Sequence, residues 1–247
     1  MPRYRSTSDF AYSFGPGPLT PAIKMLIGAN VAAFLLSFMV PVVTLRLGLI
    51  PADVFEHFAI WQPVTYMFLH GGLFHLLFNM LTLWMMGTEL ERMWGSRYFT
   101  RFYFISGVGA ALTTLLLSVL PLPFPVNLYT TLTVGASGAI YGVLLAYAMY
   151  FPNRPIMMYF LFPVPAKYFV MILGSLSLLG SISSSGGIAH TTHLGGLLAA
   201  YLYLKSGRIH PISEIKYRFL KWRINRMRRK FDVYSGGRAD DVNRRVH

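Results

Sequence analysis

The chain has 247 residues, of which 54% are hydrophobic and only 13% are charged, whereas about 25% of the residues in an ordinary soluble domain are charged. So few charges argue against a water-soluble globular protein of this size, because its surface would have too few charged side chains in contact with water. The sequence contains no cysteine, which excludes disulfides, thiolate nucleophiles and metal sites built on Cys ligands. These properties predict a polytopic membrane protein.

Long uncharged stretches predict six membrane-spanning helices. A spanning helix needs about 20 mostly apolar residues, and backbone in lipid must satisfy its own hydrogen bonds, which favours helices. Two of the stretches are too long for one span, and the loop-forming segments 121–125 and 181–187 divide them. The expected spans are residues 24–43, 71–88, 101–120, 135–151, 166–182 and 189–205. We therefore expect an all-α fold, a polytopic bundle of six transmembrane helices.

The distribution of Lys and Arg predicts the orientation of the spans. Basic residues gather before the first span and in the 2–3 and 4–5 loops, and 13 of the 22 lie from Lys205 onward. The 1–2 connection has only Arg46 against Asp53 and Glu56, and the 3–4 and 5–6 loops are uncharged. Because basic loops stay in the cytoplasm, we expect a multi-pass protein with both termini cytoplasmic.

Three regions follow from this pattern: a cytoplasmic N-terminal segment at 1–22, a six-span core at 23–205, and a basic cytoplasmic tail at 206–247. Apolar residues of the tail recur at helical spacing among Arg and Lys: Leu220, Ile224, Met227 and Phe231. We expect an amphipathic helix that binds anionic lipid headgroups, followed by a disordered end. Nucleic-acid binding is the alternative reading of the basic tail, but such charge beside a last span usually marks topology, so we expect no nucleic-acid partner.

Three polar clusters, at residues 70–79, 135–142 and 190–196, lie where the second, fourth and sixth spans begin. Polar groups inside a bilayer cost free energy and therefore need an explanation. The predicted orientation puts all three clusters at the extracytoplasmic side. Polarity and loop charge are independent signals, so their agreement predicts a functional site there.

Ser137 and His193 are the candidate catalytic residues. Small residues at every fourth position allow the fourth and sixth spans to approach closely: Gly138, Gly142, Ala146, Gly196 and Ala200. Such an approach would pair the hydroxyl with the imidazole, as a nucleophile pairs with its general base. No Asp or Glu occurs between Glu91 and Glu214, so we expect a Ser–His dyad in a water-accessible cavity.

Further residues have supporting roles in this hypothesis. Tyr141 lies one helical turn beyond Ser137 and is placed to stack on the imidazole of His193. His75 and Asn79 are four residues apart and share one face of the second span, where both can donate toward a developing oxyanion. The backbone N–H of Ser137, at a helix N-terminus, is a further donor.

Each feature also has a simpler interpretation. A Ser or Asn in a transmembrane helix is more often an interhelical hydrogen bonder than a catalyst. The histidines at 70, 75, 190 and 193 could bind a metal, yet they lack carboxylate or thiolate co-ligands and form no H-E-x-x-H motif. We expect no metal and no other cofactor, and we expect His70 and His190 to be interfacial hydrogen bonders.

Taken together, the motifs resemble those of the rhomboid family of intramembrane serine proteases over about residues 61–201. The matching pieces are His70-x-x-x-x-His75-x-x-x-Asn79, Glu91-x-x-x-Gly95, Gly135-x-Ser137-Gly138 with Tyr141, and His193-x-Gly195-Gly196. They occur in the family's order, and the site motifs fall on the second, fourth and sixth spans of a six-helix core.

The resemblance implies a serine endopeptidase that cleaves single-span membrane proteins. It assigns the nucleophile to Ser137, the general base to His193, oxyanion stabilisation to His75 and Asn79, and histidine stacking to Tyr141. Substrates would enter between the fifth span and the 1–2 loop. Six spans without a seventh helix resemble the compact bacterial form, so the expected location is a bacterial plasma (inner) membrane.

One departure and two rivals qualify the resemblance. Many relatives have Trp-Arg in the 1–2 loop, where this chain has Trp61-Gln62, so any role that needs the charge is in doubt. A non-catalytic relative that guides membrane proteins is one rival, although such proteins usually lack the serine or the histidine. A transporter or channel is the other, but no charged residue lies at mid-membrane. The oligomeric state is not predicted.

Overall fold

A computed structural model describes residues 16–121, 127–158, 162–182 and 187–206. The chain divides into two compact units, Met1–Leu204 and Lys205–His247. Of the second unit only Lys205 and Ser206 are described, and they end the last helix. The predicted tail helix and disordered end, and most of the N-terminal segment at 1–22, therefore lie outside the described residues.

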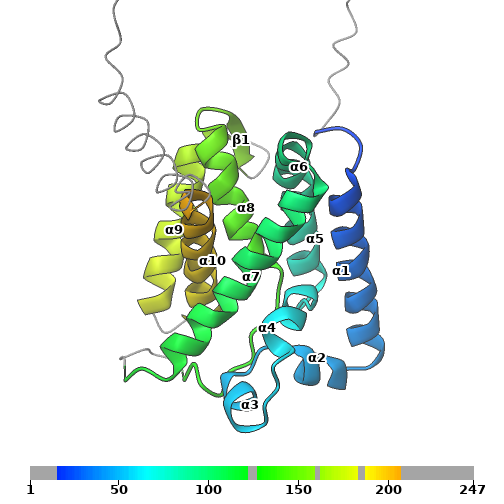
Figure 1. Ribbon diagram of the computed structural model, residues 1–247, viewed down its shortest axis with the longest axis vertical. Helices are drawn as coiled ribbons and strands as arrows, with labels where there is room; N and C mark the ends of the chain where they lie inside the picture. Colours follow the sequence, from blue (N-terminus) through cyan, green and yellow to red (C-terminus); the bar gives the residue numbers. More distant parts are fainter. Residues whose placement is uncertain (1–15, 122–126, 159–161, 183–186, 207–247) are drawn as a thin grey trace, which may run out of the picture. The chain divides into compact units, whose positions relative to one another are not determined.

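The described part of the first unit is mostly helical (Figure 1). The helices are α1 Pro21–Met39, α2 Val42–Leu47, α3 Pro51–Glu56, α4 Gln62–Thr65, η1 Tyr66–Phe68, α5 Leu73–Thr82, η2 Leu83–Gly87, α6 Thr88–Trp94, α7 Ser96–Ser118, α8 Ser137–Tyr150, α9 Ala166–Ile182 and α10 Gly187–Ser206, and an antiparallel hairpin is formed by β1 Pro155–Met158 and β2 Phe162–Pro165. Helix is thus present in each of the six expected stretches.

By length and apolar composition, two of the described helices can cross a membrane: α1 and α7. A third span results if α4–η1 and the Leu73–Trp94 stretch count as one, although they are bent by 95°. Helices α8 and α9 are apolar but shorter. The six-span bundle therefore stays a prediction, while the mostly helical fold is confirmed.

Local sequence explains several helix boundaries. Pro21 opens α1 at a position where its missing N–H costs nothing, and Pro51 does the same for α3. Between α6 and α7 the chain turns through Gly95, whose φ of +80° lies in the left-handed region that favours glycine. This turn places α6 and α7 in contact side by side.

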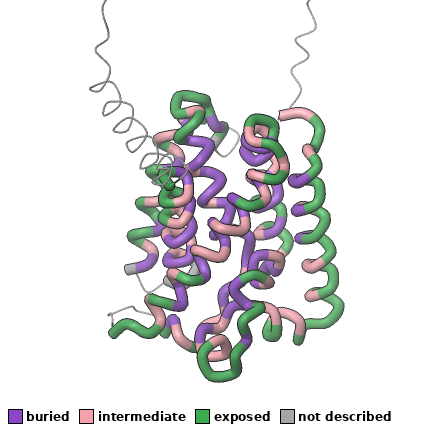
Figure 2. The backbone as a smooth tube through the Cα atoms, viewed as in Figure 1, coloured by how far each residue is buried: buried purple, intermediate pink, exposed green. Residues whose placement is uncertain are grey.

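Helix α8 lies at the centre of the described helices. It packs against α5, α7 and α9. Figure 2 shows mostly buried residues along α8 and mostly exposed residues along the outer helix α1. On its small-residue face, a Cβ added to Gly196 of α10 would overlap the backbone carbonyl of Gly138. The two helices therefore touch through their backbones, as small-residue packing allows.

The connection between α1 and α5 folds into the short helices α2 to α4. The side chain of Gln62 is 1% exposed, accepts a hydrogen bond from Ile50 N–H at 2.9 Å and donates to Asp53 at 3.3 Å. The Trp61 indole donates to the Arg46 carbonyl at 2.9 Å. The neutral, buried amide of Gln62 thus links the start of α4 to the beginning of α3.

Candidate active site

Ser137 is the first residue of α8, and the segment before it is fixed by backbone hydrogen bonds. Leu49 and Thr133 form an antiparallel bridge, and Gly135 N–H donates to the Tyr66 carbonyl at 2.9 Å. The Tyr66 hydroxyl in turn donates to the Gly107 carbonyl of α7 at 2.7 Å. The start of α8 is therefore anchored both to η1 and, through η1, to α7.

The structure brings Ser137 and His193 together. The Oγ atom of Ser137 lies 2.8 Å from Nε2 of His193, although 56 positions separate the residues along the chain. The serine comes from α8 and the histidine from α10, whose backbones touch at Gly138 and Gly196. This close approach is what allows two short side chains to reach each other.

The ring of His193 is held by an aromatic stack. Tyr141, one turn after Ser137, lies parallel to it with ring centroids 4.1 Å apart and an interplanar angle of 9°. No described residue hydrogen-bonds to Nδ1 of His193. Among the described contacts, the stack with Tyr141 therefore fixes the plane of the imidazole.

A residue that sequence analysis missed completes this chain of contacts. Ser177 of α9 is 1% exposed, and its hydroxyl donates to the Tyr141 hydroxyl at 3.1 Å. The signal available in the sequence was a serine within an apolar helix. The sequence does not show which neighbouring helix that serine faces. Helix α9 is thus connected to the histidine through Tyr141.

His75 lies beside the serine, whereas Asn79 is engaged in its own helix. A Cβ added to Gly135 would lie 2.9 Å from Cε1 of His75 and 3.5 Å from Ser137 Oγ, so the three residues meet. The Asn79 amide donates to the His75 carbonyl at 2.9 Å and its side chain is buried. The amide has a second N–H, which can donate to an oxyanion while the first keeps this bond.

Two further histidines of the polar clusters, His70 and His190, lie beside His75 and His193. The rings of His70 and His75 lie 5.0 Å apart edge to face, and those of His190 and His193 lie 6.0 Å apart. Within the described residues, no group of three or more His, Asp or Glu side chains is arranged to hold a metal ion.

Comparison with known proteins identifies the family of the chain. Residues 57–207, more than half of the chain, match the family model of the Rhomboid domain. Mitochondrial Rhomboid protein 1 of Saccharomyces cerevisiae is 35% identical over 141 residues, which cover 55% of this chain and 38% of that protein. Rhomboid protease GluP of Bacillus subtilis is 34% identical over 143 residues, or 57% and 25% of the two chains.

Rhomboid protease AarA of Providencia stuartii is 31% identical over 153 residues, which cover 58% of this chain and 54% of that protein. The matches thus span from a quarter to about half of the length of these relatives. The matched domain contains Ser137, His193, His75, Asn79 and Tyr141. The chain is an integral membrane protein that belongs to the rhomboid family.

Proposed function

We propose that this protein is an intramembrane serine endopeptidase in which Ser137 and His193 form the catalytic dyad. The observation that carries the proposal is the 2.8 Å separation of Ser137 Oγ and His193 Nε2, a distance typical of a nucleophile and its general base. The similarity of the chain to the rhomboid proteases GluP and AarA supports it.

The first half of the reaction forms an acyl-enzyme. With Nε2 unprotonated, His193 accepts the Ser137 proton while Oγ attacks the carbonyl carbon of the scissile peptide bond. The tetrahedral intermediate collapses, His193 gives the proton to the leaving amine, and the serine stays esterified. Tyr141 keeps the imidazole in the plane that serves both proton transfers.

The second half releases the product. Water reaches the ester through a cavity open to the extracytoplasmic side, and His193 accepts a proton from it as the water oxygen attacks the ester carbon. The bond between that carbon and Ser137 Oγ then breaks, His193 returns the proton to Oγ, and the new carboxyl group is released. In both halves the negative oxygen of the intermediate is stabilised by the Ser137 N–H and by His75 and Asn79. His75 already lies against Gly135 and Ser137.

Substrates are single-span transmembrane proteins, which enter between α9 and the connection formed by α2 to α4. The core of the enzyme is residues 23–205 with six spans in a bacterial plasma membrane, and segments 1–22 and 206–247 lie in the cytoplasm. The basic tail at 206–247 binds anionic headgroups, as its excess of Lys and Arg favours.

The test is cleavage of a generic single-span substrate by the purified full-length protein, compared with Ser137→Ala and His193→Ala. Both variants should be inactive while their thermal unfolding and membrane insertion match the parent. A fluorophosphonate probe should label the parent at Ser137 and leave Ser137→Ala unlabelled. Undiminished cleavage by Ser137→Ala would refute the dyad, and an inert, unlabelled parent would point to a non-catalytic relative.

A further inference from the structure

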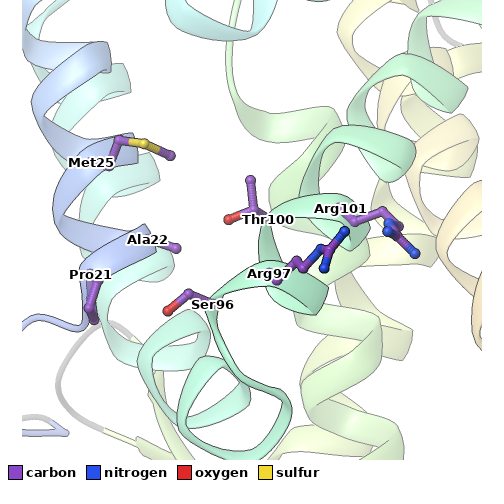
Figure 3. A pocket seen from close by; sticks show the side chains of 7 residues that line it. All are labelled: Pro21, Ala22, Met25, Ser96, Arg97, Thr100 and Arg101. Carbon is purple, nitrogen blue, oxygen red and sulfur yellow. The ribbon is translucent and has the colours of Figure 1, made fainter.

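A groove lies away from the candidate active site, between the beginnings of α1 and α7 (Figure 3). This groove has a volume of about 500 Å³ and is lined by Pro21, Ala22, Met25, Ser96, Arg97, Thr100 and Arg101. In Figure 3 the α1 residues lie across the gap from Ser96 and Thr100, and both arginine side chains extend from α7. None of these residues belongs to the site around Ser137.

The groove carries positive charge, and the carboxylate that accepts hydrogen bonds from two of its lining residues, Glu91, is buried. Arg97 and Arg101 are one turn apart on α7, both are exposed, and no carboxylate lines the groove. Neither guanidinium makes a hydrogen bond or an ion pair with a described residue, in contrast to Arg154, which pairs with Glu89. Two neighbouring guanidinium groups in this arrangement suit the planar, multidentate recognition of a phosphate.

The opposite wall is apolar, and the groove lies at the ends of two helices that are long enough to cross a bilayer. Met25 is 55% exposed and shares the α1 wall with Pro21 and Ala22. Helices α1 and α7 are the two described single helices long and apolar enough to cross a bilayer, and the groove lies where both begin. A ligand that uses both walls must have an anionic head and an apolar chain, which excludes a free phosphate ion.

We propose that this groove binds an anionic phospholipid, with its phosphate on Arg97 and Arg101 and the upper part of an acyl chain against Met25. Basic pockets between transmembrane helices are established binding sites for such headgroups in membrane proteins generally. The lipid bridges α1 and α7 at the end of the bilayer opposite the start of α8.

The test measures phosphatidylglycerol binding to the full-length protein in a neutral detergent by native mass spectrometry. Arg97→Gln with Arg101→Gln should weaken the tightest lipid by about thirty-fold, because each basic side chain near a headgroup contributes a factor of about five. The matched control, Lys24→Gln with Lys167→Gln, removes the same charge outside the groove and should leave that lipid bound. The basic tail is identical in all variants.

A second variant tests the space in the groove separately from its positive charge. Thr100→Trp fills the groove while both arginines remain, and it should also displace the lipid. Phosphatidylcholine with the same acyl chains should bind weakly, and inorganic phosphate should not compete at concentrations similar to the lipid. Equal loss in the control variant, full binding by Thr100→Trp, equal affinity for phosphatidylcholine, or effective competition by phosphate would each overturn the proposal.

Discussion

At Gly135 the backbone has a φ of +131°, a conformation that residues with a side chain rarely adopt. An added Cβ would also lie 2.9 Å from the His75 ring. The residue stands two positions before Ser137, and its N–H is the one that bonds to the Tyr66 carbonyl. Any side chain here therefore disturbs the serine and the histidine beside it at once.

We predict that Gly135→Ala lowers the rate of substrate cleavage by about a hundred-fold, since a displacement of about 1 Å at a reacting group has this effect. The measurement is kcat with a single-span substrate. Gly71→Ala is the matched control, because a Cβ at Gly71 meets no atom within 4 Å, and its kcat should stay at the parent value. A normal kcat for Gly135→Ala would show that Ser137 tolerates the strain.

The part of Asn79 in stabilising the oxyanion needs a separate test, because one N–H of its amide donates to the His75 carbonyl within the helix. If the second N–H of this amide donates to the oxyanion, Asn79→Ala should lower kcat by about 10²-fold with KM nearly unchanged. Thr82→Ala is the control, since Thr82 makes the same kind of bond to the carbonyl four residues earlier, at 2.8 Å. Equal, small effects of the two substitutions would assign Asn79 to helix structure alone.

At the scale of elements, a hydrogen bond from Ser177 to Tyr141 connects α9 to the dyad. Because Tyr141 stacks on His193, the position of α9 affects the plane in which the imidazole is held. If substrates enter beside α9, as proposed, a displacement of α9 breaks this bond and releases the Tyr141 hydroxyl.

We predict that Ser177→Ala lowers kcat about five-fold, the equivalent of about 1 kcal/mol for one net hydrogen bond. Tyr141→Phe should give a similar loss, and the double variant should lose no more than either alone. Ser181→Ala is the control on the same helix, because the Ser181 hydroxyl donates to the Leu178 carbonyl of α9 itself, at 2.7 Å. Additive losses in the double variant would contradict the coupling.

At the scale of the whole molecule, one carboxylate joins three helices. Glu91 of α6 is 2% exposed and accepts hydrogen bonds from the N–H groups of Ala22 and Ile23 at 2.9 and 3.0 Å. It also accepts from the hydroxyls of Thr20 and Ser96. Glu91 therefore caps the N-terminus of α1 and ties it to the start of α7.

Glu91→Ala should lower the free energy of unfolding by about 1–3 kcal/mol, because buried backbone donors lose their acceptor. Thermal unfolding in detergent measures this change. Glu89→Ala is the control: Glu89 pairs with Arg154 near the surface, where an ion pair contributes at most about 1 kcal/mol. Equal destabilisation by both substitutions would mean that the cap at α1 adds nothing of its own.

Sequence patterns anticipate some of this arrangement and miss the rest for physical reasons. Uncharged stretches locate the helices because lipid excludes charge, and small residues at every fourth position indicate the approach of Ser137 to His193. The hydrogen bond of Asn79 to the His75 carbonyl depends on the side-chain rotamer, which the spacing of residues in the sequence does not specify. The contact of Ser177 with Tyr141 depends on how α9 is turned against α8, which helical periodicity in a uniformly apolar segment does not specify.

A Cβ on Gly196 would overlap the backbone carbonyl of Gly138, so α8 and α10 touch at this point with no side chain between them that could adjust to a sliding movement. A rearrangement that keeps this contact carries the two helices as one body and preserves the spacing of the Ser137 hydroxyl and the His193 imidazole. If substrates enter as proposed, between α9 and the connection of α2 to α4, the entrance opens without separating these two groups.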